Sequence, residues 1–318
     1  MKKYVVTGGA GFIGSALVRG LIARGGGEIH AIDNLLTGHK QNLKEVWGGL
    51  ELHIVDIRDY EEIAPVIRGA DVVFHLAAIP SVPRSIHEPV PSHQVNIDGT
   101  FNVFRACVEG QVRRVVYAAS SSAYGDTEVL PKVESMAPRP KSPYAAQKLM
   151  GEFYASVFSD CFGLDAVSLR FFNVYGERQD PSSPYSGVIS LFMTALLERR
   201  PPTIFGDGEQ SRDFTYVEDV VALILKAADA HGVGGKVYNA GNGNRYTLNE
   251  VWRTLQKIEG VEIAPEYGPP REGDVRDSQA DVTAARRDLG HDPQYSLEQG
   301  LRRTLAWYRA SRESVAAF

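Results

Sequence analysis

Short runs of apolar, mostly β-branched residues alternate with segments of helical periodicity through the first half of the chain. The runs predict strands at residues 3–7, 28–32, 51–55, 72–77, 114–120 and 166–171. The segments between them predict helices, among them 12–24, 60–68, 91–109 and 144–162. Continuous apolar strands separated by helices are typical of a parallel sheet that is covered on both faces. The pattern therefore predicts an α/β fold with a doubly wound parallel sheet.

The pattern changes after Phe171, where the alternation of strand and helix stops. Proline and glycine cluster at residues 176–187, 201–208 and 265–273. Helices are expected between these loops, at residues 187–199, 218–230, 248–259 and 297–311. We therefore expect two parts, a Rossmann domain and a smaller mixed α/β lobe. The domain takes residues 1–172 and a returning segment at about 213–245, and the lobe takes 173–212 and 246–318.

Composition narrows the class of protein. Of the 318 residues, 43% are apolar and 23% charged, as in an ordinary soluble globular protein. The net charge of -5 argues against nucleic-acid and anionic-membrane partners, and the apolar runs are too short to span a bilayer. Two cysteines, Cys107 and Cys161, suggest neither a disulfide framework nor a zinc site. We expect a cytoplasmic protein without a metal.

A glycine-rich loop joins the first strand to the first helix. Gly8, Gly11 and Gly14 are spaced so that the backbone can turn sharply, approach a pyrophosphate and pack helix against strand. The N–H groups of the following residues, Phe12 and Ile13, then belong to a helix N-terminus, which favours a phosphate. The motif predicts a dinucleotide site.

Asp33 ends the second strand, 19 residues beyond Gly14. A carboxylate at this place can accept hydrogen bonds from the adenosine ribose hydroxyls, and it repels a 2′-phosphate. The next residues, Asn34 and Leu35, supply no arginine for such a phosphate. NAD is therefore favoured over NADP.

Two further strand ends fit the same cofactor. Asp56 and Ile57 follow the third strand, where they can meet the adenine ring. Leu76, Ala77 and Ala78 end the fourth strand, and small residues there let the nicotinamide half lie against the backbone. Taken alone, each of these is ordinary strand-end chemistry.

A serine, a tyrosine and a lysine are the candidates for catalysis. Ser120 closes the fifth strand, so it points toward the same crevice as the cofactor, although a serine there can equally be a helix cap. Tyr144 and Lys148 lie one turn apart near the start of a helix that Ser142 can cap. A free phenol has a pKa near 10, and a nearby ammonium, the helix dipole and a bound NAD⁺ ring would together lower it. The spacing alone also suits two neighbours on a solvated helix face.

The order of these motifs resembles an extended short-chain dehydrogenase/reductase and, over essentially the full length, the nucleotide-sugar epimerase/dehydratase family. The narrower likeness rests on "LRFFNVYGERQDP" (169–181), "IFGDGEQSRDFTYVEDV" (204–220) and "PPREGDVRDSQAD" (269–281). Within the family, the chain is most similar to the UDP-hexose 4-epimerases. The resemblance implies NAD as cofactor, a UDP-sugar as substrate, and Asn96 as one more cofactor contact.

The resemblance assigns roles to the catalytic candidates. Tyr144 would remove the proton of the sugar 4-hydroxyl, Lys148 would bind the nicotinamide ribose and lower the tyrosine pKa, and Ser120 would share the O4 proton. Related 4,6-dehydratases carry an Asp-Glu pair after this serine, whereas here Ser121 and Ser122 follow. Both serines are candidate substrate contacts, and the absence of an acid pair favours epimerisation over dehydration.

The resemblance also implies substrate contacts in the second half of the chain. They include a pyrophosphate contact, two phosphate-binding arginines, a ribose carboxylate and a uracil border. These are Asn173, Gly187, Val188, Thr203, Phe205, Arg212, Arg271 and Asp274. A plain reading of Arg212 and Arg271 is that each forms an ion pair with a loop aspartate.

Ser278 and Arg84 bear on which sugar is accepted. In the family a bulky residue at the place of Ser278 restricts the pocket to plain hexoses, so serine favours UDP-N-acetylglucosamine and UDP-N-acetylgalactosamine beside UDP-glucose and UDP-galactose. The loop after the fourth strand offers Ser81, Arg84 and Ser85 as sugar contacts. Arg84 can also meet a carboxylate, which leaves UDP-glucuronate as a substrate.

Three other expectations remain. A 4-keto-sugar reductase would need its cofactor to exchange in every cycle. A dinucleotide-sensing protein without enzyme activity would be expected to lack the Tyr144–Lys148 pair. The helices at 91–109 and 144–162 carry more apolar residues than one core face needs, and in the resembling family this pair forms the interface of a homodimer.

Overall fold

The structure is a computed structural model that describes residues 1–181, 187–270 and 275–316. Its centre is a seven-stranded parallel sheet with the order β11-β6-β5-β4-β1-β2-β3. The strands are β1 (Lys3–Thr7), β2 (Glu28–Ile32), β3 (Glu51–His53), β4 (Val72–His75), β5 (Arg114–Ser120), β6 (Asp165–Phe171) and β11 (Val237–Ala240). This order reverses direction next to β1, so a crevice forms where β1 and β4 end. The predicted doubly wound fold is confirmed.

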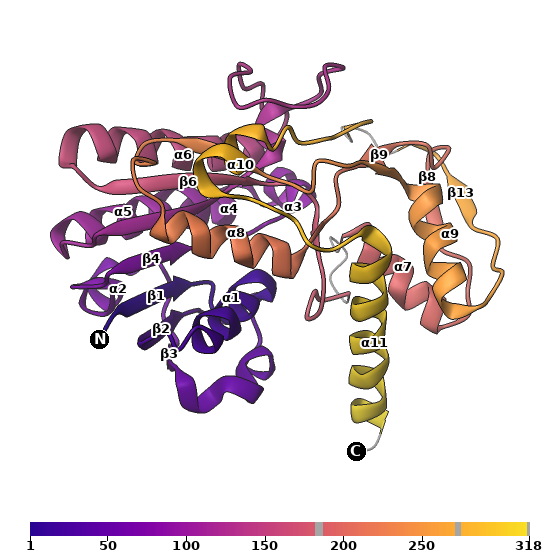
Figure 1. The fold of residues 1–318 in the computed structure, drawn as a ribbon, viewed down its shortest axis with the longest axis horizontal. Coiled ribbons are helices and arrows are strands. Elements are labelled where there is room, and N and C mark those ends of the chain that lie inside the picture. The colour runs from indigo at the N-terminus through magenta and orange to yellow at the C-terminus, as the bar shows by residue number, and fades with distance from the viewer. Residues whose placement is uncertain (182–186, 271–274, 317–318) are drawn as a thin grey trace.

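Helices cover both faces of the sheet (Figure 1). One face carries α1 (Phe12–Ala23) and α8 (Val217–Asp229), and the other carries α2 (Tyr60–Ile67), α5 (Thr100–Glu109) and α6 (Pro143–Phe162). The two faces are built by alternate residues of each strand: Val6 packs with Leu17 of α1, whereas Val5 packs with Phe104 of α5. A sheet that is buried on both faces needs the continuous apolar strands seen in the sequence.

The predicted helix 91–109 is interrupted. It consists of α4 (Pro89–His93), a π-helical stretch η2 (Gln94–Gly99) and then α5. Residues 82–87, which were read as loop, form the short helix α3 (Val82–His87), because Ser81 caps it and Pro83 fits its first turn. The 3₁₀ segments are η1 (Lys40–Gly49) and η3 (Ser121–Tyr124).

The second part lies beside the carboxyl ends of the strands, at the right of Figure 1. It consists of helices and two-stranded pairs, β7 with β10, β8 with β13 and β9 with β12. Its elements are β7 (Val174–Tyr175), α7 (Val188–Leu197), β8 (Thr203–Phe205), β9 (Ser211–Arg212), β10 (Thr215–Tyr216), β12 (Tyr246–Thr247), α9 (Leu248–Glu259), β13 (Glu266–Gly268) and α11 (Leu297–Ala316). The short helix α10 (Thr283–Leu289) instead lies against β11 and α8 at the sheet.

The apolar core is continuous across the two parts. One cluster of buried side chains joins Val6 in the sheet and Val220 in α8 with Phe192 in α7, Trp252 in α9 and Leu301 in α11. The segment at 213–245 contributes α8 and the edge strand β11 to the sheet. The division into a domain and a lobe at the predicted boundaries remains a prediction.

Two negative findings concern the part of the chain that the structure describes. None of its helices is long and apolar enough to cross a membrane. Cys107 is buried and Cys161 is exposed, and neither forms a disulfide.

Candidate active site

A cavity of about 930 Å³ lies at the carboxyl ends of the strands, between the sheet and the second part. Most of the site residues expected from the sequence line it, and they come from segments that lie far apart along the chain. These are Gly8, Gly11, Phe12, Ile13, Gly14, Asp33, Asn34, Ile57, Leu76, Ala77, Ala78, Arg84, Ser120, Ser121, Ser122, Tyr144, Lys148, Asn173, Gly187, Arg212 and Ser278. A pocket of this size is large enough for a dinucleotide together with part of a second ligand.

The glycine loop is shaped as a phosphate cradle. Gly8 has a φ of +70°, and a Cβ there would lie 2.8 Å from the backbone nitrogen of Ala77. A Cβ on Gly14 would lie 2.0 Å from the carbonyl oxygen of Gly8, so only glycine allows this close packing. A Cβ on Gly11 would instead meet only one protein atom within 4 Å, the carbonyl oxygen of Gly8 at 3.1 Å, while Gly11 itself lines the cavity.

The N-terminus of α1 meets the cavity at this loop. Its N-cap is Gly11, so no side chain caps the helix, and its first turn carries no acidic residue. The partial positive charge of the helix end is therefore available to an anion in the cavity. The residues present fit the pyrophosphate of NAD.

Asp33 is held in place by backbone groups. Its carboxylate accepts hydrogen bonds from the N–H groups of Ala10 (3.0 Å) and Leu35 (2.8 Å), and burial raises its pKa above the ordinary value. Each oxygen keeps a lone pair for one hydroxyl of a ribose in the cavity. This geometry fits the adenosine ribose of NAD.

Asp56 does not line the cavity. Its carboxylate accepts hydrogen bonds from the guanidinium of Arg58 (2.9 Å) and from the side-chain amide of Asn34 (2.7 Å), and these bonds, Arg58 first, lower its pKa to about 2. Ile57 beside it does line the cavity. In this structure Asp56 therefore orients Asn34, and a direct contact with adenine remains a prediction.

The loop after β4 is supported by a buried histidine. His75 is fully buried, and its two ring nitrogens lie within hydrogen-bond distance of the hydroxyls of Thr7 (2.8 Å) and Thr100 (2.9 Å). Burial, with a smaller contribution from Lys148, lowers its pKa to about 3, so the ring is neutral near pH 7. The hydroxyl of Thr7 also accepts a hydrogen bond from the N–H of Ala77 (3.2 Å), which fixes the small residues at the cavity wall.

Asn96 lies behind that wall and does not line the cavity. It is buried, its side-chain oxygen accepts a hydrogen bond from the N–H of Ile79 (2.8 Å), and its amide donates to Gln147 in α6 (2.8 Å). It therefore ties the loop after β4 to the helix that carries Tyr144, and a direct contact with the cofactor remains a prediction.

Ser120, Tyr144 and Lys148 meet in the cavity, as the sequence predicts. Ser142 caps α6 by accepting the N–H of Ala145 (3.2 Å), which places Tyr144 in the first turn. The Tyr144 side chain forms a hydrogen bond with Ser120, and the ammonium of Lys148 donates to the carbonyl oxygen of Ala118 in β5 (2.8 Å). The end of β5 and the start of α6 thus hold the three side chains together.

Ser120 also contacts the serines that follow it. Its oxygen accepts hydrogen bonds from the N–H (3.2 Å) and the hydroxyl (2.8 Å) of Ser122. Ser120 is therefore both the N-cap of η3 and a residue of the cavity wall. The two interpretations that the sequence left open, a helix cap and a residue facing the crevice, are both correct. The hydroxyl of Ser122 can pass a proton to Ser120 without a rearrangement.

The acid–base balance of the pair in the protein alone is set by burial. Burial raises the pKa of Tyr144 to about 12, against a smaller lowering by its hydrogen bond to Ser120. Burial also lowers the pKa of Lys148 to about 8, against a smaller raising by Glu152. Desolvation therefore outweighs the neighbouring charge in the protein alone, and the phenol holds its proton near pH 7. The lowering expected from the sequence needs the positive charge that NAD⁺ adds.

A buried ion pair supports Lys148 from behind. Glu152, one turn further along α6, accepts two hydrogen bonds from the guanidinium of Arg170 in β6, at 2.9 and 2.7 Å. The side chains are only 3% and 4% exposed, and the guanidinium also lies 4.5 Å from the ring centre of Tyr124. The sequence carries no pattern that reveals this pair, because its members are 18 residues apart in two different elements.

The second part of the chain contributes a polar wall. The amide of Asn173 donates to the carbonyl oxygen of Asp213 (3.3 Å) and to the hydroxyl of Ser278 (3.4 Å). The guanidinium of Arg212 donates to the carbonyl oxygen of Arg276 (2.8 Å). The backbone N–H of Ser278 donates to the carbonyl oxygen of Ser211 (3.0 Å), which holds this segment against β9.

Several expected substrate contacts lie elsewhere. Val188, Thr203 and Phe205 do not line the cavity, although Gly187 beside Val188 does. Arg271 and Asp274 lie outside the described residues. Their contacts with a substrate remain predictions.

Asp213 and Lys132 were not singled out from the sequence as site residues. Asp213 is buried, and its carboxylate accepts hydrogen bonds from the N–H groups of Asn242 (2.8 Å), Gly243 (2.9 Å) and Ala280 (3.0 Å). Lys132 lines the cavity, its side chain is nearly fully buried, and its ammonium donates to the carbonyl oxygen of Thr127. Burial lowers the pKa of Lys132. Asp213 stands in the segment 204–220 that carries the family resemblance, where the sequence suggests only an ion pair with Arg212, and Lys132 stands in a loop without a motif.

Comparison with known proteins identifies relatives over the whole chain. Residues 4–241 match the NAD-dependent epimerase/dehydratase family. A UDP-glucose 4-epimerase of Mycolicibacterium smegmatis is 38% identical over 311 residues, which cover 96% of this chain and 98% of that protein.

Two solved structures are also similar. A UDP-N-acetylglucosamine 4-epimerase from Methanobrevibacter ruminantium, in complex with UDP-N-acetylmuramic acid, has a TM-score of 0.93 at 38% identity, covering 98% of this chain and 99% of that one. A UDP-glucuronic acid 4-epimerase from Bacillus cereus, in complex with UDP-glucuronic acid and NAD, has a TM-score of 0.91 at 30% identity, covering 97% and 99%.

Proposed function

This chain belongs to the NAD-dependent epimerase/dehydratase family and is a UDP-sugar 4-epimerase, and we propose that it accepts UDP-N-acetylglucosamine and UDP-N-acetylgalactosamine as well as UDP-glucose and UDP-galactose. The observation that carries the substrate proposal is the small side chain of Ser278 at the cavity wall. Its hydroxyl accepts a hydrogen bond from the amide of Asn173 (3.4 Å), and a serine here takes less of the cavity than a bulky side chain would, which favours a 2-acetamido group.

The proposed mechanism assigns the proton at sugar O4 to Tyr144 and Ser120. A bound NAD would supply the acceptor and donor of the hydride at sugar C4. Tyr144 takes the O4 proton as the hydride leaves and gives it back after the 4-keto sugar has turned. Ser120 holds the same oxygen, and Ser122, which donates to Ser120, completes a short hydroxyl chain. No carboxylate follows Ser120 directly, so elimination of water has no acid–base pair there.

Lys148 has a separate role. Its ammonium donates a hydrogen bond to the carbonyl oxygen of Ala118. Its lowered pKa, about 8, means that the side chain loses its proton at mildly alkaline pH. In its charged form it binds a ribose hydroxyl and favours the phenolate of Tyr144. It therefore acts on the tyrosine pKa and on cofactor position, and it does not transfer the O4 proton.

Arg84 supports UDP-glucuronate as a second substrate. It lines the cavity and would meet a C6 carboxylate, although in this structure its guanidinium pairs with Glu88 at 3.0 Å. A uronate would have to compete with Glu88 for this arginine, which is why neutral sugars are preferred here.

One experiment separates these possibilities. The purified protein is incubated with UDP-N-acetylglucosamine, UDP-glucose and UDP-glucuronate separately, without added cofactor, and the C4 epimers are separated by anion-exchange chromatography. We expect the first two to be epimerised, and Tyr144→Phe to abolish this while Tyr154→Phe on the same helix does not. Consumption of added NAD⁺ with stoichiometric formation of NADH and the 4-keto sugar would identify a nucleotide-sugar oxidoreductase instead, and epimerisation of the uronate alone would contradict the proposed preference.

We also propose a homodimer. The outer surfaces of α5 and α6 carry large apolar side chains that are exposed in the single chain, with exposed fractions of 41% to 59% for Phe101, Phe153, Val157 and Phe162. Exposed aromatic and aliphatic side chains on two adjacent helices are typical of an interface between subunits. Light scattering on Phe153→Asp should give a monomer, whereas Val129→Asp, at another exposed apolar position, should leave the dimer intact. A wild-type monomer at micromolar concentration would contradict the proposal.

A cytoplasmic location completes the proposal. It is supported by two cysteines that form no disulfide and by a cofactor and substrate class that occur inside cells.

A further inference from the structure

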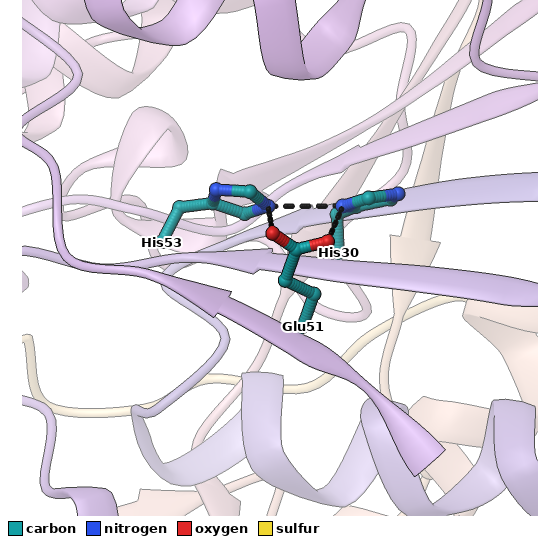
Figure 2. Close-up of side chains that lie close together, drawn as sticks. All are labelled: His30, Glu51 and His53. Atoms are coloured by element: carbon teal, nitrogen blue, oxygen red, sulfur yellow. Dashed lines mark hydrogen bonds and ion pairs between the residues drawn. The ribbon is translucent and has the colours of Figure 1, made fainter.

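Two histidines and a glutamate face one another at the edge of the sheet, outside the cavity (Figure 2). His30 lies on β2, and Glu51 and His53 lie on the edge strand β3, with His30 paired to Glu51 and Ile32 to His53 in the parallel register. The three side chains therefore point to the same side of the two strands. None of them lines the cavity of the active site.

The ligand atoms of this cluster converge. Nδ1 of His30 lies 2.9 Å from Nε2 of His53, and the two carboxylate oxygens of Glu51 lie 3.6 Å and 3.7 Å from these two nitrogens, one each. Figure 2 shows the carboxylate below the two rings, with one oxygen turned toward each of them. When both imidazoles are neutral, only one of the two facing nitrogens carries a hydrogen, and it donates that hydrogen to the other nitrogen. The second nitrogen presents a lone pair, so it cannot donate a hydrogen bond to the carboxylate.

A second carboxylate orients the buried ring. Nε2 of His30 lies 2.7 Å from Oε1 of Glu28, two residues earlier on the same strand. This bond places the ring proton on Nε2, so that Nδ1 presents its lone pair to His53 and Glu51. A carboxylate that accepts the far N–H of a histidine is the usual outer support of a metal-binding imidazole, because it fixes the tautomer and makes the ligand more basic.

We propose that His30, Glu51 and His53 bind a divalent first-row transition metal ion of the zinc class, with water in the fourth position. Metal–ligand bonds of about 2.0 to 2.1 Å in a tetrahedron place ligand atoms about 3.3 Å apart. The two nitrogens are closer together than this, and each carboxylate oxygen is farther than this from its nearer nitrogen. The rings would therefore move apart by about 0.4 Å, and one oxygen of Glu51 would move in to face both nitrogens. Two imidazoles and one carboxylate suit zinc and its neighbours, whereas magnesium and calcium prefer oxygen ligands alone.

Access and charge are compatible with such a site. The His30 side chain is 9% exposed, that of His53 21% and that of Glu51 67%, so an ion reaches the cluster from solvent. Glu28 and Glu51 contribute two negative charges. Lys3 on the neighbouring strand opposes a cation, but its ammonium donates to the carbonyl oxygen of Arg68 (3.1 Å).

The site would brace the sheet beside the cofactor. The backbone carbonyl of His53 accepts the N–H of Asp33 (3.0 Å), the residue whose carboxylate faces the cavity. An ion that joins His30 to His53 therefore joins β2 to the edge strand three residues before Asp33. The role of the metal is structural, and no step of epimerisation passes through it.

The test uses the full-length protein without a histidine tag, freed of metal by a chelator. Zinc is titrated calorimetrically in the presence of millimolar magnesium, and cobalt is titrated separately by its visible absorption, which is intense for four ligands and weak for six. We expect one zinc per chain, an intense cobalt band, and at least tenfold weaker binding in Glu51→Gln and in His53→Gln. Glu28→Gln should weaken binding 10- to 100-fold, while His231→Ala, an exposed histidine elsewhere, should bind as the wild type does.

Urea unfolding in chelator keeps this test interpretable. The variants should unfold near the wild-type midpoint without metal, and zinc should raise the midpoint of the wild type and of His231→Ala only. Equal zinc affinity in wild type and His53→Gln would overturn the proposal. So would binding that appears only at millimolar zinc, in which case the cluster is a hydrogen-bonded Glu28–His30–His53 chain that braces the edge without an ion.

Discussion

Replacing Glu152 by glutamine tests whether the ion pair behind Lys148 is a stability determinant. The change leaves the guanidinium of Arg170 charged in a site where its side chain is 4% exposed and where Nη1 already has no hydrogen-bond acceptor among the described residues. Removing one partner of a buried pair costs about 3 to 5 kcal/mol, because the remaining charge stays desolvated. For a chain of 318 residues this corresponds to a fall in melting temperature of about 5 to 7 °C.

The assay is urea unfolding followed by circular dichroism at one fixed protein concentration, with a thermal scan beside it. Glu109→Gln is the matched control, because it breaks the pair with Arg105 on α5 at 2.8 Å, where both side chains are about half exposed. Such a pair is screened by water, so its loss should leave the midpoint unchanged.

A double variant separates the charge from the geometry. Glu152→Leu with Arg170→Met removes both charges and keeps much of the volume, so it should recover at least half of the stability lost in Glu152→Gln. The reasoning is refuted if Glu152→Gln lies within 1 kcal/mol of the wild type, or if the double variant is less stable than either single one.

Three further predictions follow from the site. In the cofactor-free protein, the lowered pKa of Lys148 means that its charge destabilises the fold below pH 8, and that stability is gained as pH rises from 8 toward 10.5. The unfolding free energy of the wild type should therefore rise relative to that of Lys148→Met by about 2 to 3 kcal/mol between pH 7 and 10. A difference that stays constant with pH would contradict the burial argument. Gly11→Ala should fold normally but bind NAD at least tenfold more weakly, as measured by fluorescence titration. Gly14→Ala should also lower the free energy of unfolding, because its Cβ would lie 2.0 Å from a carbonyl oxygen. Ser278→Tyr should reduce kcat/KM for UDP-N-acetylglucosamine far more than for UDP-glucose, with Ser278→Thr as control; equal losses for both sugars would refute the proposed gate.

The sequence predicts the sheet well because its signals are local. The six expected strands begin within one residue of the observed ones, and the glycine spacing, Asp33 and the Tyr144–Lys148 turn each lie within one strand–helix unit. The sequence did not predict β11 as a strand, because its four residues stand between glycines and its partner β6 is about 70 residues away. The effect of burial on the pKa of Tyr144 could not be predicted, since desolvation depends on packing that no spacing in the sequence indicates.

Long-range hydrogen bonds explain the other differences. The resemblance implies that Asn96 contacts the cofactor, and in the structure its amide binds the loop at Ile79 and Gln147, which no spacing in the sequence indicates. Asp213 reads as a loop partner of Arg212, whereas its carboxylate accepts three backbone N–H groups from segments 29 to 67 residues away. Such choices among several partners are made only when the chain has folded.

The continuous apolar core has a consequence for how the substrate range of this protein can change. Because one cluster joins Val6 in the sheet to Phe192 and Leu301 beyond it, a cut between the two parts would expose apolar surface on both pieces. We therefore expect that the second part cannot be exchanged as an independent module, and that separately produced halves aggregate. On this view a change of substrate range would come from replacing single side chains on the loops around the cavity, such as Ser278.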